Sequence, residues 1–153
     1  MPITDSIEEC LLPACEQVLE TMFFTGVLSA EKLAAGEEPR SCAAVIATVK
    51  FEGPPDGALC VGMEAETAVA LASTFLGLDP PDVTDADCRQ VVGEMANMMC
   101  GSVLSRVVPE SSLRLASPVV RDGQETPCGP ACAARAFFTL PEGGLHVCVG
   151  AVS

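Results

Sequence analysis

A stretch of about 24 residues between Thr84 and Pro109 constrains the fold most, because it predicts one long helix. Thr84 is a favourable N-cap, and Asp85 and Asp87 fall in the first turn, where the helix dipole favours carboxylates. At about 100° per residue, the apolar side chains of this helix gather on one broad side. These are Val92, Met95, Ala96, Met99, Val103 and Val107. This side is predicted to face the core.

The segments before this helix predict a helix, a hairpin and a second helix. A helix over about residues 5–25 would be capped by Asp5, kinked or divided by Pro13 and ended by Gly26. Residues 29–41 are polar and predict a loop. Alternating apolar residues over 45–51 and 59–63, around the turn 53–57, predict a hairpin. A helix over 64–76 would stop at Gly77.

The segments after the long helix predict strands. These cover residues 113–120, 131–140 and 145–152, with a loop at 121–130. The resulting order, α-β-β-α-α-β-β-β, predicts an α+β fold in which a largely antiparallel or mixed sheet packs against long helices. At 153 residues, we expect one domain over 1–153.

The charge of the chain limits its partners. It has 8 basic and 21 acidic residues, a net charge of −13, which argues against nucleic acid and anionic membrane surfaces. No apolar run reaches the roughly 18 residues of a membrane span, and the acidic N-terminus lacks signal-peptide features. Several of the nine cysteines, such as Cys60, Cys100 and Cys148, lie in apolar runs and are interpreted as small buried hydrophobes. We therefore expect a reduced, soluble, cytoplasmic protein.

Polar residues share a narrow arc on the other side of the long helix, here called the polar strip. It is about 27 Å long at 1.5 Å per residue, and its members are Asp87, Gln90, Glu94, Asn97, Gly101 and Ser105. Asn97 is the only asparagine in the chain, although asparagine is a mediocre helix former. Gly101 lies one turn beyond it, where a missing side chain would let another surface come close.

The pair Glu94 and Asn97 allows a limited chemistry. An asparagine amide does not titrate near neutrality, so it cannot be a general base, but it can orient a water molecule. A glutamate can form an ion pair with a cation on a partner. The alternative is that this face is simply solvated, as most polar helix faces are. If the pair is functional, it predicts a docking and positioning device.

At these residues the chain resembles a family. The segment 93–101, with the spacing E-x-x-N, is similar to the motif helix of the CheX/CheC/FliY chemotaxis phosphatases, and most closely to CheX. The order of the other segments agrees, including Phe75-Leu76-Gly77 and Ser117-Pro118-Val119-Val120. The resemblance implies a CheC-like fold and covers most of the chain.

The resemblance also implies an activity. These proteins hydrolyse the aspartyl phosphate of the response regulator CheY. Glu94 would engage a lysine of the regulator, and Asn97 would position the attacking water. The other strip residues and Met98 are candidates for contact with this partner. The chain would need no cofactor of its own, because the Mg²⁺ belongs to the regulator, and a homodimer that joins sheets is implied.

The sequence departs from the family pattern one turn before the motif glutamate. Gln90 stands four residues before Glu94, where the pattern often has an acidic residue or serine. The family proline about twenty residues downstream has Pro118 as its candidate. The first predicted helix carries no second E-x-x-N motif, which is more similar to CheX than to CheC.

Several other interpretations remain open. The same face could bind a receiver domain without accelerating hydrolysis, as an adaptor. Cys100 and Arg106 match the C-x5-R spacing of cysteine-dependent phosphatases, although Cys100 would lie in mid-helix. Cys128 and Cys132 could suggest a metal or redox pair, but their spacing is not C-x2-C. For His146, the only histidine, a structural role is expected.

Overall fold

The computed structural model describes residues 3–33, 44–53, 56–108, 113–123 and 134–152. Three α-helices, one short 3-10 helix and seven strands occur in this part of the chain. Their bounds are α1 Ile3–Met22, β1 Ser29–Lys32, β2 Val45–Glu52, β3 Asp56–Met63, α2 Ala65–Leu76, η1 Pro80–Asp82, α3 Asp85–Val107, β4 Arg114–Leu115, β5 Val119–Asp122, β6 Ala134–Leu140 and β7 Gly143–Val152.

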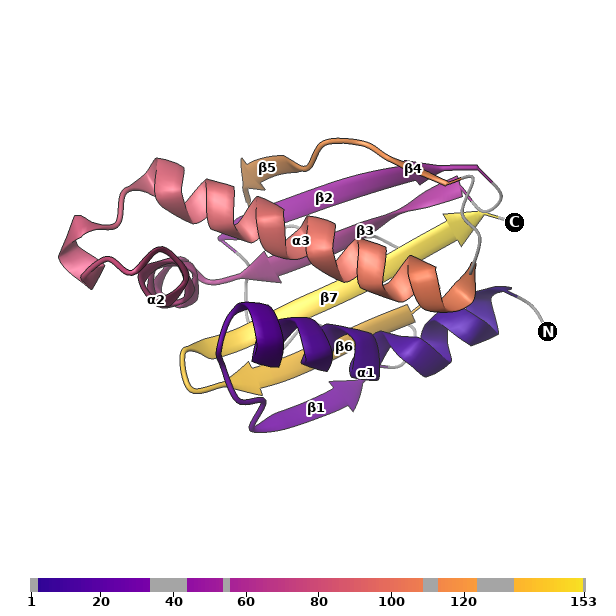
Figure 1. The fold of residues 1–153 in the computed structure, drawn as a ribbon, viewed down its shortest axis with the longest axis horizontal. Coiled ribbons are helices and arrows are strands. Elements are labelled where there is room, and N and C mark those ends of the chain that lie inside the picture. Colours follow the sequence, from indigo (N-terminus) through magenta and orange to yellow (C-terminus); the bar gives the residue numbers. More distant parts are fainter. Residues whose placement is uncertain (1–2, 34–43, 54–55, 109–112, 124–133, 153) are drawn as a thin grey trace.

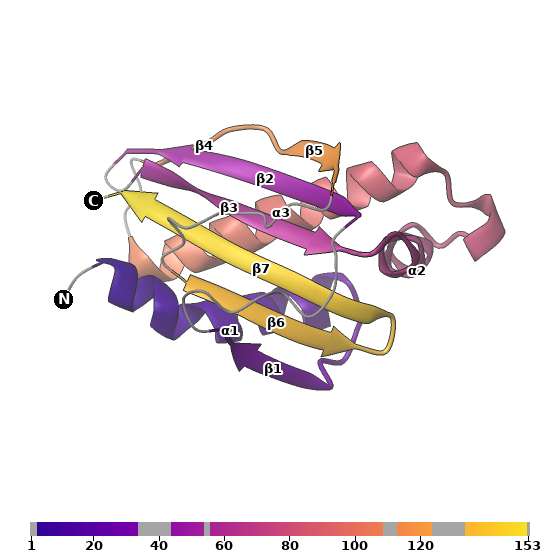
Figure 2. The ribbon, with the colours of Figure 1, turned by 180° about the vertical axis from the view of Figure 1, so that it is seen from behind.

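The strands form one antiparallel sheet on which two of the helices lie. The strand order is β1-β6-β7-β3-β2-β4, and β5 also pairs with β2. Helices α1 and α3 run side by side over one face of this sheet, and α2 lies beyond one end (Figure 1). Figure 2 shows the strands in front and the helices behind. The predicted fold class, α+β with a largely antiparallel sheet, is confirmed.

The hydrophobic core lies between the helices and the sheet. In β2 the alternate residues Val45, Ala47, Val49 and Phe51 all point into it, as their spacing predicts. β2 pairs with β3 in the predicted hairpin, with Val45 opposite Met63 and Phe51 opposite Gly57. The predicted core side of the long helix is also buried, except that Val107 is only partly so.

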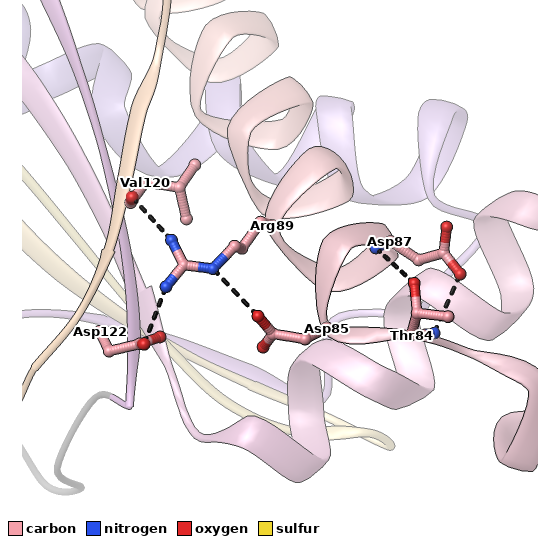
Figure 3. A network of polar contacts seen from close by, with 6 residues as sticks. All are labelled: Thr84, Asp85, Asp87, Arg89, Val120 and Asp122. Atoms are coloured by element: carbon pink, nitrogen blue, oxygen red, sulfur yellow. Dashed lines mark hydrogen bonds and ion pairs between the residues drawn. The ribbon is translucent and has the colours of Figure 1, made fainter.

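Local chemistry sets the ends of α2 and α3. The Thr84 hydroxyl accepts a bond from the Asp87 amide at 3.1 Å, and the Asp87 carboxylate accepts one from the Thr84 amide at 3.0 Å (Figure 3). This reciprocal pair is a capping box. α2 ends at Gly77, whose φ of 70° is left-handed and favours glycine. Both helices therefore begin and end within a residue or two of the predicted positions.

The structure corrects two predictions about strands. Residues 29–32, predicted as part of a loop, form β1, which pairs with β6 at the edge of the sheet. Their sequence SAEK lacks apolar alternation, because a short strand at the edge of a sheet can stay largely solvated. The predicted single strand 113–120 is divided into β4 and β5, both paired with β2. Pro118, which has no amide hydrogen to donate, lies between them.

The first helix also differs from its prediction. α1 is one continuous helix that contains Pro13, so of the two predicted effects of this proline, a kink or a division, the structure excludes the division. Pro13 is exposed, and water can therefore reach the backbone carbonyl that loses its partner. Asp5 lies inside the first turn rather than at the cap, since the helix starts at Ile3. The helix ends at Met22, before the predicted stop at Gly26.

The described residues contain no helix that is long and apolar enough to cross a membrane.

Cys148 is buried in β7 as predicted, but it is disulfide-bonded, so its interpretation as a reduced thiol is wrong. Cys10, Cys15, Cys88 and Cys100 are free thiols. Within the described residues, the cysteines of the helices are therefore thiols, and at least one cysteine of the sheet is oxidised.

His146 makes the stability of the fold sensitive to acid. It is buried in β7, and burial followed by the positive charge of Arg135 lowers its pKa from 6.5 to about 4. The unfolded chain takes up this proton near pH 6.5, so the stability contributed by neutral His146 is complete above that pH and is lost as pH falls toward 4. Between pH 7 and pH 4.5, we expect the free energy of unfolding of His146→Met to fall by about 2–3 kcal/mol less than that of the wild type. Urea unfolding at both pH values measures this difference, and equal losses in the two proteins would contradict it.

Candidate functional site

The polar strip of α3 lies on the outside of the helix. Gln90, Glu94 and Ser105 are exposed, and Asp87, Asn97 and Gly101 are half-buried. The residues on the opposite side of the same helix, such as Met95, Met99 and Val103, are buried in the core. The strip residues therefore share one accessible surface, as the helical period predicts.

Glu94 and Asn97 have no partner within the described part of the protein. No hydrogen bond or ion pair joins the Glu94 carboxylate or the Asn97 carboxamide to another described residue. The two side chains are one turn apart on the same helix, so their Cβ atoms are about 5–6 Å apart. An accessible acceptor and an accessible amide are thus available side by side for an external group.

Two strip residues already use their polar atoms, one at the N-cap of α3 and one inside the helix. The Asp87 carboxylate is held by the capping box, and the Ser105 hydroxyl donates to the carbonyl oxygen of Ser102 at 3.0 Å. Gln90 is exposed, and Met98 is half-buried beside the strip and packs partly on the core. Contact of these residues with a partner stays a prediction.

Gly101 leaves open space beside Asn97. A Cβ added to Gly101 would meet no atom within 4 Å. The absence of a side chain is therefore not required by packing inside the described structure. A mid-helix glycine lowers the free energy of unfolding by about 1 kcal/mol relative to alanine. The packing would allow an alanine here, so the glycine carries a cost in stability that packing does not require.

α3 is held on both flanks. On the α1 flank, the hydroxyl of Ser102 donates to the Ala14 carbonyl oxygen at 3.4 Å, and the Arg106 guanidinium donates to the Gln17 side-chain oxygen at 2.5 Å. On the β5 flank, Arg89 donates to the carbonyl oxygen of Val120 at 2.9 Å. The helix that carries the strip is thus a fixed support.

Gly93 lets the β5 flank come close to the motif. A Cβ at Gly93 would lie 3.3 Å from Cγ2 of Val120 and 3.4 Å from Cγ of Pro118. Pro118 therefore lies against the helix at the residue preceding Glu94. The sequence interpretation missed Arg89 and Gly93; their spacing of four residues, which places them on one side of the helix, was the available signal.

The cysteine interpretations receive no support from the described residues. Cys100 is fully buried in the middle of α3, and burial raises its pKa to about 12, so it is not a thiolate near neutrality. This contradicts a C-x5-R phosphatase site. Cys128 and Cys132 lie outside the described residues, and within those residues no group of three or more potential metal ligands occurs.

Comparisons with known proteins agree with this architecture. The family model described as "Chemotaxis phosphatase CheX" matches residues 45–140. The comparison with curated proteins gives no significant match. Solved structures that share the fold include CheX from Desulfovibrio desulfuricans, with 20% identity, coverage of 95% of this chain and 99% of that chain, and a TM-score of 0.75.

Two further structures are similar to the same extent. The CheX–CheY–BeF3–Mg2+ complex from Borrelia burgdorferi contains a chain with 20% identity, coverage of 95% and 97%, and a TM-score of 0.75. CheX from Vibrio vulnificus has 19% identity, coverage of 95% and 96%, and a TM-score of 0.73. Identities this low establish the fold alone, whereas the family match spans well over half of the chain. The protein therefore belongs to the CheX family of chemotaxis phosphatases.

Proposed function

We propose that this chain accelerates hydrolysis of the aspartyl phosphate of a CheY-type response regulator. In this proposal Glu94 forms an ion pair with a lysine at the regulator's active site, and Asn97 orients the attacking water in line with the phosphorus. The observation that carries it is the accessible, unengaged pair of Glu94 and Asn97 on a helix fixed at both flanks.

The chemistry suits a site that lacks a general base. An aspartyl phosphate is an acyl phosphate and is already reactive, so positioning of water can supply most of the acceleration. An increase of 100- to 1,000-fold needs only about 3–4 kcal/mol of transition-state stabilisation. Asn97 can accept a hydrogen bond from the water and donate another, which fixes the direction of its lone pair.

The partner would complete the site. The Mg²⁺ that neutralises the phosphoryl oxygens belongs to the regulator, and no metal ligand is required from this chain. A relative of the same fold has been solved in a CheX–CheY–BeF3–Mg2+ complex, which supports a CheY-like partner here. The polar strip, together with Met98, is proposed as the contact surface.

The resemblance further suggests a cytoplasmic homodimer that joins two sheets. β1 at one end of the described sheet, and β4 and β5 at the other, each pair with a single strand of the described sheet and so offer edges.

A phosphate-release time course tests the activity. CheY-type receivers from the same organism are phosphorylated in Mg²⁺ with a small-molecule phosphodonor, and release is followed with and without this chain. We expect at least one receiver to lose its phosphate about 100-fold faster in the presence of catalytic amounts of the chain. Tight binding without acceleration would instead assign the chain to the receiver-binding adaptors and refute the enzymatic proposal.

Gly101→Ala separates stability from docking. Because nothing lies within 4 Å of the added methyl group, we expect the free energy of unfolding to rise by about 1 kcal/mol. The same methyl group would stand between α3 and a closely docked receiver, so hydrolysis should slow. Thermal unfolding and phosphate release measure the two effects.

Gly26→Ala is the matched control for this change. Its added Cβ also meets no atom within 4 Å, but it lies outside α3. Activity should remain at the wild-type level. Unchanged hydrolysis in Gly101→Ala would exclude close approach of the receiver at this position.

A further inference from the structure

Arg89 connects α3 to the neighbouring strand β5. Its Nη1 donates to the Val120 carbonyl oxygen at 2.9 Å, and its Nη2 lies 2.8 Å from Oδ2 of Asp122. Its Nε lies 3.2 Å from Oδ2 of Asp85, one turn earlier on the same helix. Figure 3 shows the guanidinium between these three groups. One side chain thus binds two residues of the strand and one of the helix.

We propose that Arg89 is a positioning residue that fixes the rotation of α3 about its own axis, and hence the direction in which Glu94 and Asn97 project. The inference rests on the proposed function, because it assigns how the same site is held. Arg89 itself does not need to touch the receiver.

The β5 flank depends on this contact. β5 has four residues and pairs only with β2 within the described sheet. It also packs on α3 through Val120, which with Pro118, just before the strand, lies close to Gly93. Arg89 and Gly93 are one turn apart, and Asn97 follows one turn after Gly93, so the same side of the helix carries the anchor and then the motif. A planar guanidinium can hold a carbonyl and a carboxylate at once in fixed directions, which a lysine cannot.

A small rotation of α3 would be costly for positioning. The side chains of a helix reach about 6 Å from its axis, so a rotation of about 10° moves an outer atom by about 1 Å. A displacement of that size at a reacting group can cost about 100-fold in rate. The α1 flank is held through Ser102 and Arg106, and Arg89 supplies the polar link on the opposite flank, to Val120 and Asp122.

The two aspartates that bind Arg89 provide a matched pair of variants. Asp122→Asn weakens the link between helix and strand, whereas Asp85→Asn weakens a contact within the helix. Each removes one negative charge from an exposed side chain, 70% and 80% accessible respectively. We expect Asp122→Asn to lower kcat about tenfold with little change in KM, and Asp85→Asn to leave both near the wild-type values.

Asn97 gives a second readout that does not depend on activity. As the sole asparagine, it provides one backbone amide signal and one side-chain amide pair in protein labelled with [15N]asparagine. For this readout the two aspartates are replaced with alanine, so that Asn97 stays the sole asparagine: we expect its signals to shift in Asp122→Ala and to coincide with the wild type in Asp85→Ala. Unmoved Asn97 signals in Asp122→Ala, or equal shifts in both alanine variants, would overturn the assignment of Arg89. If the wild type hydrolyses no phospho-receiver, the proposed function fails, and the Asn97 spectra alone decide whether Arg89 sets the orientation of the helix.

Discussion

Replacing Asn97 with alanine is expected to return receiver dephosphorylation to its uncatalysed rate, a loss of about 100- to 1,000-fold. The reason is that Asn97 is the group proposed to hold the attacking water, and alanine offers no donor or acceptor. The fold should be unaffected, because the carboxamide makes no hydrogen bond to another described residue and alanine is the better helix former. Single-turnover phosphate release, at saturating concentrations of the variant, measures the chemical step directly.

The control for Asn97→Ala is Thr74→Ala. Thr74 is an exposed polar residue of α2 whose hydroxyl donates only within its own helix, to the Ala70 carbonyl oxygen. The Thr74→Ala variant should retain full activity. If Asn97→Ala keeps wild-type single-turnover rates with an unchanged melting temperature, the water-positioning role assigned to Asn97 is wrong.

Replacing Glu94 with alanine is expected to weaken receiver binding as well as to slow hydrolysis. An ion pair that becomes desolvated at an interface contributes about 2 kcal/mol or more, so the dissociation constant should rise about 30-fold. Binding to a receiver loaded with beryllofluoride, followed by fluorescence anisotropy, separates this effect from catalysis. Glu94→Gln keeps the shape of the side chain and should lose most of the same affinity, because the charge is what the lysine recognises.

The net charge of the chain requires its own control. Glu20→Ala removes one negative charge from an exposed position on α1, away from the polar strip. It tests whether general attraction between an acidic chain and a basic partner explains the result. Equal losses of affinity in Glu94→Ala and Glu20→Ala would contradict the docking assignment. Normal binding by Glu94→Ala would do so on its own.

Local signals explain why α3 could be predicted from the sequence. Thr84 and Asp87 cap the helix through bonds between near neighbours, Pro109 follows its last residues, and the apolar side repeats at the helical period. The accessible face that carries Glu94 and Asn97 follows from the same period. The hairpin β2–β3 and the stop at Gly77 were predictable for the same reason, since each is determined by adjacent residues.

Tertiary contacts explain what could not be predicted. β1 is a strand because β6 offers it a partner more than a hundred residues later, and its own four residues carry no strand pattern. The link from Arg89 to Asp122 joins residues that no sequence pattern connects. The place of Pro118 beside Gly93 likewise depends on where β5 pairs with β2. The motif was therefore visible in the sequence, whereas the contacts that hold it were not.

The buried thiols of the two sheet-covering helices offer a way to watch the protein open. Cys15 of α1 and Cys100 of α3 are both wholly enclosed, and burial raises the pKa of each thiol, so neither reacts with alkylating reagents while the helices stay in place. The chain contains no tryptophan or tyrosine and therefore has little intrinsic fluorescence to report on its folding. The rate at which these thiols are alkylated, followed by mass spectrometry, therefore measures how often the helices separate from the sheet.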